Sequence, residues 1–161
     1  MNLFILDLDF KRNAEAHVDT HIVKMPLEAA QLACTALIEH GTTAQYKPTH
    51  RNHPCAIWTR ETRSNFIWTC EYGLALCKEY NFRYGKFHKC ADVLKDCLWK
   101  YESIPLGEQT DFAIAIPEQH LLKFPKDAVS LYRNYYNYGK RHLHKWTSRP
   151  TPDWIHVEEG V

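Results

Sequence analysis

Several familiar signatures are missing from this chain of 161 residues. It has no G-x-S-x-G turn, no Walker loop and no G-x-G-x-x-G fingerprint, which excludes the usual serine-hydrolase and nucleotide-binding folds. No apolar run approaches the roughly 20 residues that span a bilayer. The first residues also lack the basic start and long apolar stretch of a secretory signal. Because 45% of the residues are apolar, we expect a folded globular domain without a membrane span.

The chain also has no large excess of positive or negative charge. The 20 basic and 19 acidic side chains leave a formal net charge of +1 at pH 7. Nonspecific binding of DNA through bulk charge is therefore not indicated, and any grip on phosphate has to come from a local cluster. Ten histidines and 13% aromatic residues are the notable excesses. Such side chains suit base stacking, hydrogen bonding and proton transfer, but they also suit a core.

The chain has no C-x-x-C pair. Its six cysteines are Cys34, Cys55, Cys70, Cys77, Cys90 and Cys97. Four of them fall in stretches with helical spacing, where a free thiol is a small apolar filler. Without a secretory signal, we expect all six to be reduced and the protein to be cytosolic.

The spacing of apolar residues predicts an all-α protein, a single compact domain of five or six helices over residues 1–161 with a short extended N-terminal segment. The first expected helix begins near Lys11 behind an Asp9 cap, and others cover about 16–41, 54–61 and 90–101, with Pro54 in the first turn of the second of these. A long helix over about 64–85 is capped by Ser64 and ended by Gly85, and a last helical region follows Pro125 to about residue 146. Pro26 fits either the first turn of a helix that starts near Met25 or a kink in a longer one. Residues 102–124 should be mostly irregular.

One face of the helix expected over 16–41 is polar. Its members are His21, Lys24, Glu28, Gln31 and Thr35, which follow three-and-four spacing. A solvated face would explain such a row, but the mixture of imidazole, amine, carboxylate and amide also suits a site. Glu28 is the best single candidate for a general base or electrostatic partner, with a structural salt bridge to Lys24 as the alternative.

The segment YKPTHRNHPCAIWTR, residues 46–60, is the second candidate region. Its histidines and cysteine could suggest zinc, together with those of the segment 88–90, but the spacing is loose and no zinc signature emerges. We therefore predict neither a metal nor a cofactor. Lysine and arginine suit phosphate, histidine suits hydrogen bonding or proton transfer, and tryptophan suits stacking on a base.

These residues predict one anion-accepting nucleotide pocket. The expected catalytic residues are Glu28, His50 and His53. The expected ligand-binding residues are His21, Lys24, Gln31, Lys47, Trp58, Arg60, Arg63, Arg83 and His88. For Arg83 the alternative is an ordinary helix ion pair with Glu79, four residues earlier.

The segment YRNYYNYGKRHLHKW, residues 132–146, interleaves basic and aromatic side chains. Proteins that bind single strands or flipped bases use such a mixture, although helical spacing also explains Leu131, Tyr135 and Tyr138 as core residues. An aromatic surface on this last helix would fit a homo-oligomer that encloses its ligand between subunits.

Several motifs point to a family. The run D-x-H-I-V-K-M-x-L-E-x-A-Q, the run Y-K-P-T-H-x-N-H-P-C-x-x-W-x-R-E-T-R-x-N, and the end W-x-x-R-P-x-P-x-W resemble small uncharacterised proteins of tailed bacteriophages over about residues 1–154. This resemblance implies a phage protein in the cytoplasm of a bacterial host. The pattern Y-x-x-x-H-x-N-H-P and the helix that ends in R-Y-G-K are also similar to phage-type pyrimidine-dimer DNA glycosylases.

The glycosylase resemblance implies attack on a damaged nucleotide by an N-terminal α-amino group and a glutamate, whose part Glu28 could play. The sequence departs from that pattern in two ways. A methionine ahead of Asn2 is normally retained, so a threonine-type N-terminal amine is not supplied. The near-neutral charge also differs from the basic surface expected of an enzyme that scans duplex DNA.

Three hypotheses follow, and they leave open whether the protein is an enzyme. The first is a glycosylase-like enzyme that acts on a nucleotide or a DNA base. The second is a noncatalytic phage anti-defence protein that sequesters a nucleotide immune signal, for example a cyclic one. The third is a structural or interaction protein whose polar row is merely hydrated.

Overall fold

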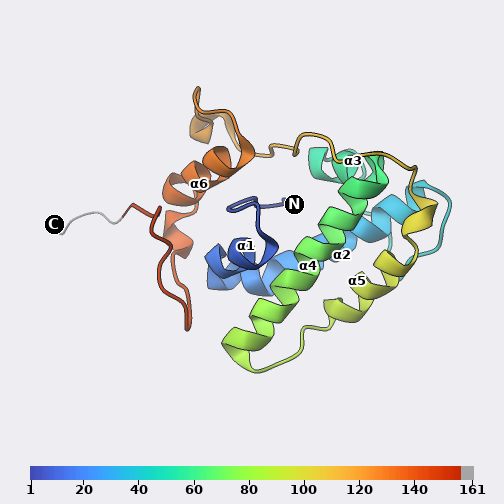
Figure 1. The fold of residues 1–161 in the computed structure, drawn as a ribbon, viewed down its shortest axis with the longest axis horizontal. Coiled ribbons are helices and arrows are strands. Elements are labelled where there is room, and N and C mark those ends of the chain that lie inside the picture. The colour runs from blue at the N-terminus through green and yellow to red at the C-terminus, as the bar shows by residue number, and fades with distance from the viewer. Residues whose placement is uncertain (157–161) are drawn as a thin grey trace.

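The computed structural model describes residues 1–156 and shows six α-helices (Figure 1). They are α1 (Phe10–Ala16), α2 (Asp19–Glu39), α3 (Pro54–Glu61), α4 (Arg63–Tyr84), α5 (Cys90–Trp99) and α6 (Ala128–Tyr138), with short 3-10 turns at Tyr101–Ser103, Glu118–His120 and Arg141–Leu143. No strand occurs within the described residues, so the prediction of an all-α protein is confirmed. The last five residues of the expected C-terminal tail, 157–161, lie outside them.

The two long helices form the centre of the domain. Helix α2 packs against α3, α4 and α5, and α4 also contacts α1 and α3. Gly73 lets α4 approach its neighbours closely, because a Cβ there would lie 2.9 Å from the Cβ of Ala29 and 2.7 Å from a methyl group of Leu94. Helix α2 continues through Pro26, so the long-helix alternative is the one observed.

Caps explain where the helices begin and end. The carboxylate of Asp9 accepts a hydrogen bond from the Arg12 amide at the start of α1, as predicted. Helix α4 begins behind Thr62 and not behind Ser64, because the Thr62 hydroxyl accepts from the backbone amide two residues into the helix. Gly85 ends α4 with φ +66°, a conformation that favours glycine.

The last helical region is shorter than predicted. Helix α6 begins at Ala128, where the side chain of Asp127 caps it, and it ends at Tyr138. The following residues turn back as a 3-10 turn and an irregular segment that packs against α1 and the start of α2. The buried face of α6 consists largely of tyrosines, so these rings are mainly core residues.

The N-terminal segment is extended and runs through the interior (Figure 1). The residues Leu3 to Leu6 are all almost fully buried. Since no neighbouring strand satisfies their backbone, side chains do so: the Phe4 amide donates to the Tyr72 hydroxyl and the Leu6 amide donates to the Asn13 side chain. This burial carries the first residue of the chain into the helical core.

All six cysteines are free and buried, which agrees with the apolar-filler interpretation. Within residues 1–156, no helix has the length and apolar character needed to cross a membrane.

Candidate functional site

The first residue and Glu28 form a buried ion pair. The α-amino nitrogen of Met1 lies 3.0 Å from Glu28 Oε1, and both groups are almost completely enclosed. The second carboxylate oxygen, Glu28 Oε2, is buried without any hydrogen-bond partner. An unsatisfied buried carboxylate oxygen is costly, so it marks a position where a further donor would be stabilising.

The amine is held in place by Asn2. The Asn2 side-chain oxygen accepts hydrogen bonds from the Leu3 backbone amide at 2.8 Å and from the Tyr132 hydroxyl at 2.9 Å. The Asn2 side-chain nitrogen donates to the Ala115 carbonyl at 2.9 Å. These contacts come from three separate parts of the chain. The position of the Met1 nitrogen is therefore fixed by the surrounding fold and not only by its ion pair.

The loop before α3 lies against α2 close to this pair. The Thr49 amide donates to the Thr35 hydroxyl, and that hydroxyl lies 3.3 Å from the Thr49 carbonyl oxygen. The next residue, His50, adopts φ +48°, which is uncommon for a residue with a side chain. The His50 carbonyl then accepts from the His53 amide, which leads directly into α3.

His53 is near enough to the ion pair to be influenced by it. Its pKa is lowered first because partial burial disfavours the imidazolium, and then because the Met1 ammonium and the His50 side chain lie nearby, whereas Glu28 opposes the shift. His53 Nδ1 accepts from the Cys55 amide at 3.0 Å, which places the proton of the neutral ring on Nε2. Of the predicted catalytic residues, Glu28 and His53 thus lie near each other, and the exposed His50 lies near His53.

The pair has the elements of nucleophilic catalysis by an amine. A deprotonated α-amine is a nucleophile for sugar or carbonyl carbons, and a carboxylate at hydrogen-bonding distance is the group that can accept its proton. Cys55 also borders this region, but burial raises the pKa of its thiol to about 12. The amine, and not the thiol, is therefore the nucleophile that this arrangement offers.

His21 lies two turns before Glu28 on α2 and faces the core. It stacks on Phe4 with ring centroids 4.4 Å apart, and its Nδ1 is hydrogen-bonded to the Tyr136 hydroxyl at 2.6 Å. Burial lowers the pKa of His21 to about 2, and nearby positive groups add to the effect. His21 is consequently a neutral structural neighbour of the site.

Two lysines, Lys24 and Lys140, and the imidazole of His142 form what we call the basic cluster near His21. All three lie close enough to His21 to lower its pKa. Lys24 and His142 are exposed, and Lys140 is half-buried with its ammonium over the Tyr135 ring. Lys24 lies one turn before Glu28 on α2, so it is the member of the basic cluster that is nearest to Glu28 in the sequence.

Several predicted ligand-binding residues lie elsewhere. Trp58 is buried against Trp68 and the Phe112 ring, so it packs in the core. Arg63 donates to the carbonyl oxygens of residues 102 and 104, and Arg60, on α3, donates to the Arg51 carbonyl in the loop before that helix. We leave these three residues out of the site because their polar groups are used structurally.

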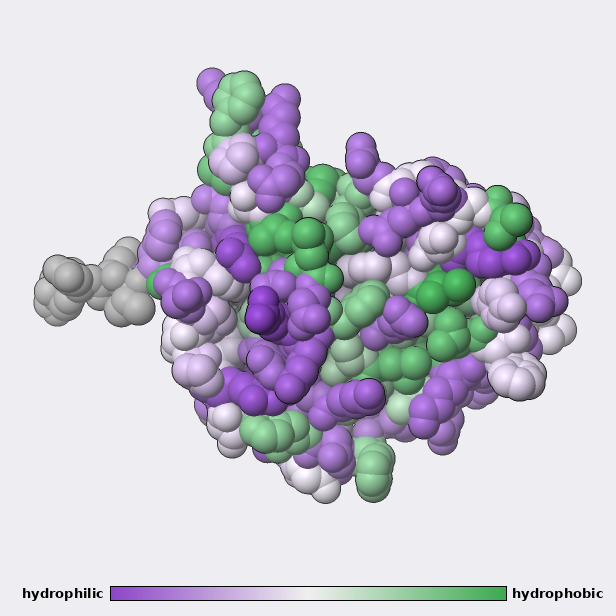
Figure 2. Space-filling model, viewed as in Figure 1, coloured by the Kyte–Doolittle hydropathy of each residue, from purple (hydrophilic) through white to green (hydrophobic). Residues whose placement is uncertain are grey.

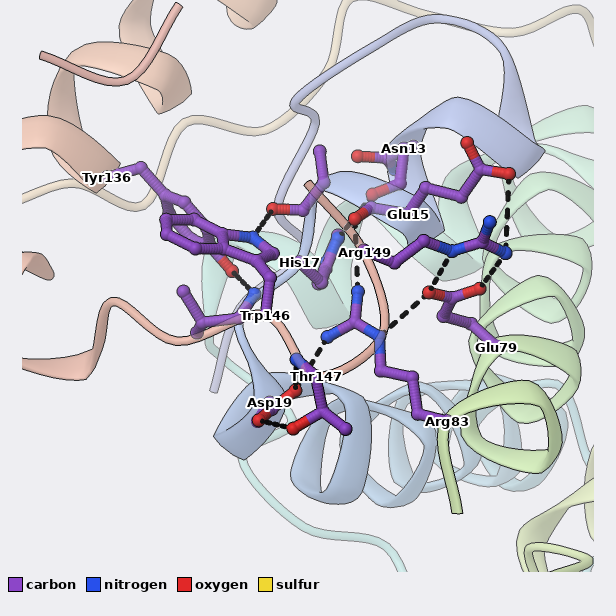
Figure 3. A network of polar contacts seen from close by, with 12 residues as sticks. Asn13, Glu15, His17, Asp19, Glu79, Arg83, Tyr136, Trp146, Thr147 and Arg149 are labelled. Atoms are coloured by element: carbon purple, nitrogen blue, oxygen red, sulfur yellow. Dashed lines mark hydrogen bonds and ion pairs between the residues drawn. The ribbon is translucent and has the colours of Figure 1, made fainter. Parts of the chain in front are cut away.

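His88 and Arg83 also have structural partners. His88 accepts from the Cys90 amide at the start of α5 and contacts the Val23 carbonyl. Arg83 belongs to a polar network drawn in Figure 3, where its Nε donates to Glu79 at 2.8 Å and its Nη1 donates to Asp19 at 3.0 Å. The ion-pair alternative for Arg83 is therefore the arrangement observed. Its guanidinium is occupied by Glu79, Asp19 and the Glu15 carbonyl and does not join the predicted anion-accepting pocket.

The same network attaches the C-terminal segment. Arg149 donates two hydrogen bonds to Glu79, and Thr147 donates its amide and hydroxyl to Asp19 (Figure 3). The pKa of Asp19 is lowered because these hydrogen bonds and Arg83 outweigh its partial burial. The network fastens the segment after α6 to α1, α2 and α4.

Two predicted residues remain on the surface near the site. Gln31 is half-buried one turn after Glu28, and Lys47 is exposed in the loop that carries His50. Among residues 1–156, no group of three or more histidine, cysteine or acidic side chains is placed to hold a metal ion.

Sequence reasoning missed two parts of the site. The anchor at Asn2 and the approach of residues 140–142 to α2 depend on long-range packing. The pairing of an N-terminal amine with a glutamate was implied only by the resemblance to the glycosylases, and the apolar run at the N-terminus gave no sign of where the amine would lie.

Comparisons with known proteins identify no relative: no protein-family model, no curated protein and no solved structure matches this chain.

Proposed function

We propose that this chain is a glycosylase-like phage enzyme that processes a base or nucleotide in DNA, with the Met1 amine and Glu28 at its reacting centre. The observation that carries the proposal is the enclosed 3.0 Å pair of Met1 and Glu28 with its unpartnered Oε2. It adds to the sequence resemblance, because that resemblance calls for an N-terminal amine and a glutamate at one place.

In the proposed reaction, Glu28 takes the proton of the Met1 ammonium and the freed nitrogen attacks C1′ of the target sugar. The glycosidic bond breaks, and the base leaves with the bonding electrons and takes up the proton that Glu28 holds. One proton of the attached nitrogen then passes to the ring oxygen O4′ as the sugar ring opens, which leaves a protonated imine between the Met1 nitrogen and C1′. His53, neutral and with its proton on Nε2, is the nearby group suited to donate a hydrogen bond to the leaving base.

The basic cluster of Lys24, Lys140 and His142 supports a phosphate-bearing substrate. Phosphate contacts by lysine position a nucleic acid without reading its sequence. Lys24 is one helical turn from Glu28, so a phosphate held there lies on the side of α2 that carries the ion pair.

The test is reductive trapping on protein whose free Met1 amine is verified by intact mass. The protein is incubated with oligonucleotides that carry modified bases or an abasic site, and borohydride converts any imine into a stable amine. We expect a covalent adduct that peptide mapping locates at Met1. A matched protein with two extra residues ahead of Met1 should bind the oligonucleotide but form no adduct there.

A second candidate function is a noncatalytic anti-defence protein that sequesters a small nucleotide. The near-neutral net charge favours it, because a long duplex is usually held by an excess of positive charge. The variant Glu28→Gln separates the two candidates: an enzyme loses turnover and keeps ligand binding. Recovery of intact nucleotide from heat-denatured wild-type protein, without any adduct, would favour sequestration. Absence of binding to any nucleotide or oligonucleotide would contradict both.

A further inference from the structure

Helices α4 and α5 leave an apolar groove on the surface. A hollow of about 630 Å³ lies between them, with Leu74, Ala91 and Leu98 among its lining residues. A second hollow of about 410 Å³ continues it toward the start of α4, beside Trp99. Leu98 lines both, so they form one groove, and Figure 2 shows apolar side chains gathered along this face.

Two large aromatic side chains project at opposite ends of this groove. Phe87, which follows α4, is 92% exposed, and Trp99, which ends α5 near the start of α4, is 87% exposed. Large aromatic residues so exposed are characteristic of contact surfaces, since burying either ring removes a large apolar area from water.

The groove carries two opposite charges that do not pair with each other within one molecule. Glu71 and Lys78 lie on either side of Leu74 on the same face of α4 and line the same hollow. Seven residues separate them, about 10 Å along the helix, so they do not pair with each other. Glu71, Lys78 and also Lys95, which is on α5, form no ion pair with another residue in the range 1–156.

We propose that this face is the interface of a symmetric homodimer in which the two copies of α4 pack antiparallel. A two-fold axis beside Leu74 lies midway between Glu71 and Lys78, each about 5 Å away along the helix. Glu71 of one copy then faces Lys78 of the other, and the reverse pair forms at the same time. The same axis brings the projecting Phe87 of each copy to the hollow beside Trp99 of the other.

A second copy fits this groove better than a different partner. An acidic amphipathic helix would suit Lys78 and Lys95 but would place negative charge against Glu71. A basic one would meet the reverse conflict. Only a partner with the same charges in the opposite direction satisfies Glu71 and Lys78 together, and a second copy of this chain has that order.

Charge reversal tests the pairing. We expect the wild-type protein to sediment as a dimer at about 200 µM and as a monomer at about 1 µM. Lys78→Glu and Glu71→Lys should each weaken the dimer roughly tenfold, because each creates two like-charge contacts. Mixing the two variants should restore a dimer that contains one copy of each. Reversal of an exposed lysine away from the groove, Lys123→Glu, should change nothing.

The aromatic contact has its own test. Phe87→Ser should also weaken the dimer, whereas Leu106→Ser at a similarly exposed site is the matched control. Circular dichroism verifies that each variant is folded. A protein that stays monomeric at about 200 µM, or a dimer that neither Lys78→Glu nor Phe87→Ser weakens, overturns the proposal. Failure of the two charge variants to form a mixed dimer overturns the antiparallel arrangement.

Discussion

Mild acid should destabilise this protein because two histidines are buried in their neutral form. Burial lowers the pKa of His17 to about 3 and that of His21 to about 2. The hydrogen bonds agree: His17 Nδ1 donates to the Asn13 carbonyl, so its Nε2 accepts from Tyr72. In the unfolded chain both rings bind a proton near pH 6.5. Unfolding therefore takes up protons, and the free energy of unfolding falls as the pH drops below that value.

The size of the effect follows from these pKa values. Lowering the pH from about 7.5 to 5.0 should reduce the free energy of unfolding by about 2 kcal/mol for each histidine, or about 4 kcal/mol together. This is a large share of the 5–15 kcal/mol that is typical of a domain. The pKa of His53 is lowered as well, which adds to the loss.

Urea unfolding followed by tryptophan fluorescence at constant ionic strength measures this loss across the pH range. His21→Gln should remove about half of it, about 2 kcal/mol, because one titrating group is gone. His40→Gln, at an exposed position, is the matched control and should keep the full loss. A total loss below about 1 kcal/mol, or an identical loss in His21→Gln and the wild type, would refute buried neutral histidines.

Three further predictions concern the scaffold. Arg83→Met should lower the free energy of unfolding by about 3–5 kcal/mol, since it leaves Glu79 and Asp19 without their shared buried partner, and a stability equal to the wild type would contradict this. Gly73→Ala should cost about 1–3 kcal/mol in thermal unfolding, because the new methyl group meets Leu94 and Ala29 at less than 3 Å. Thr35→Val should cost about 1–2 kcal/mol and weaken nucleotide binding through the loop at Thr49, whereas unchanged affinity would separate that loop from the site.

The helices were readable from the sequence because their signals are local. Asp9, Pro54 and Gly85 mark helix ends by their own backbone and side-chain chemistry, and all three act as expected. Ser64 was predicted as the cap of α4, whereas Thr62, two residues earlier, is the observed cap. Helix α6 began later than Pro125 because Asp127 supplies the cap that proline lacks.

The candidate site was only half readable for the opposite reason. The row from His21 to Thr35 is fixed by helical spacing, so Glu28 could be selected from the sequence. The structural role of Arg83 could not be selected in this way, because its partners Asp19 and Glu15 are more than 60 residues away in the sequence. A guanidinium that satisfies buried acids and one that awaits a phosphate have the same local pattern.

The placement of the Met1 amine connects the buried histidines to the proposed chemistry. The segment that carries Met1 is fixed by Phe4, which stacks on His21, and by Tyr72, which bonds both the Phe4 amide and His17. Protonation of either histidine would break this arrangement. As the pH is lowered, the yield of the borohydride-trapped adduct should therefore fall together with the fraction of folded protein. If trapping instead falls while the protein stays folded, a group at the reacting centre titrates first, and the two histidines act only as scaffold.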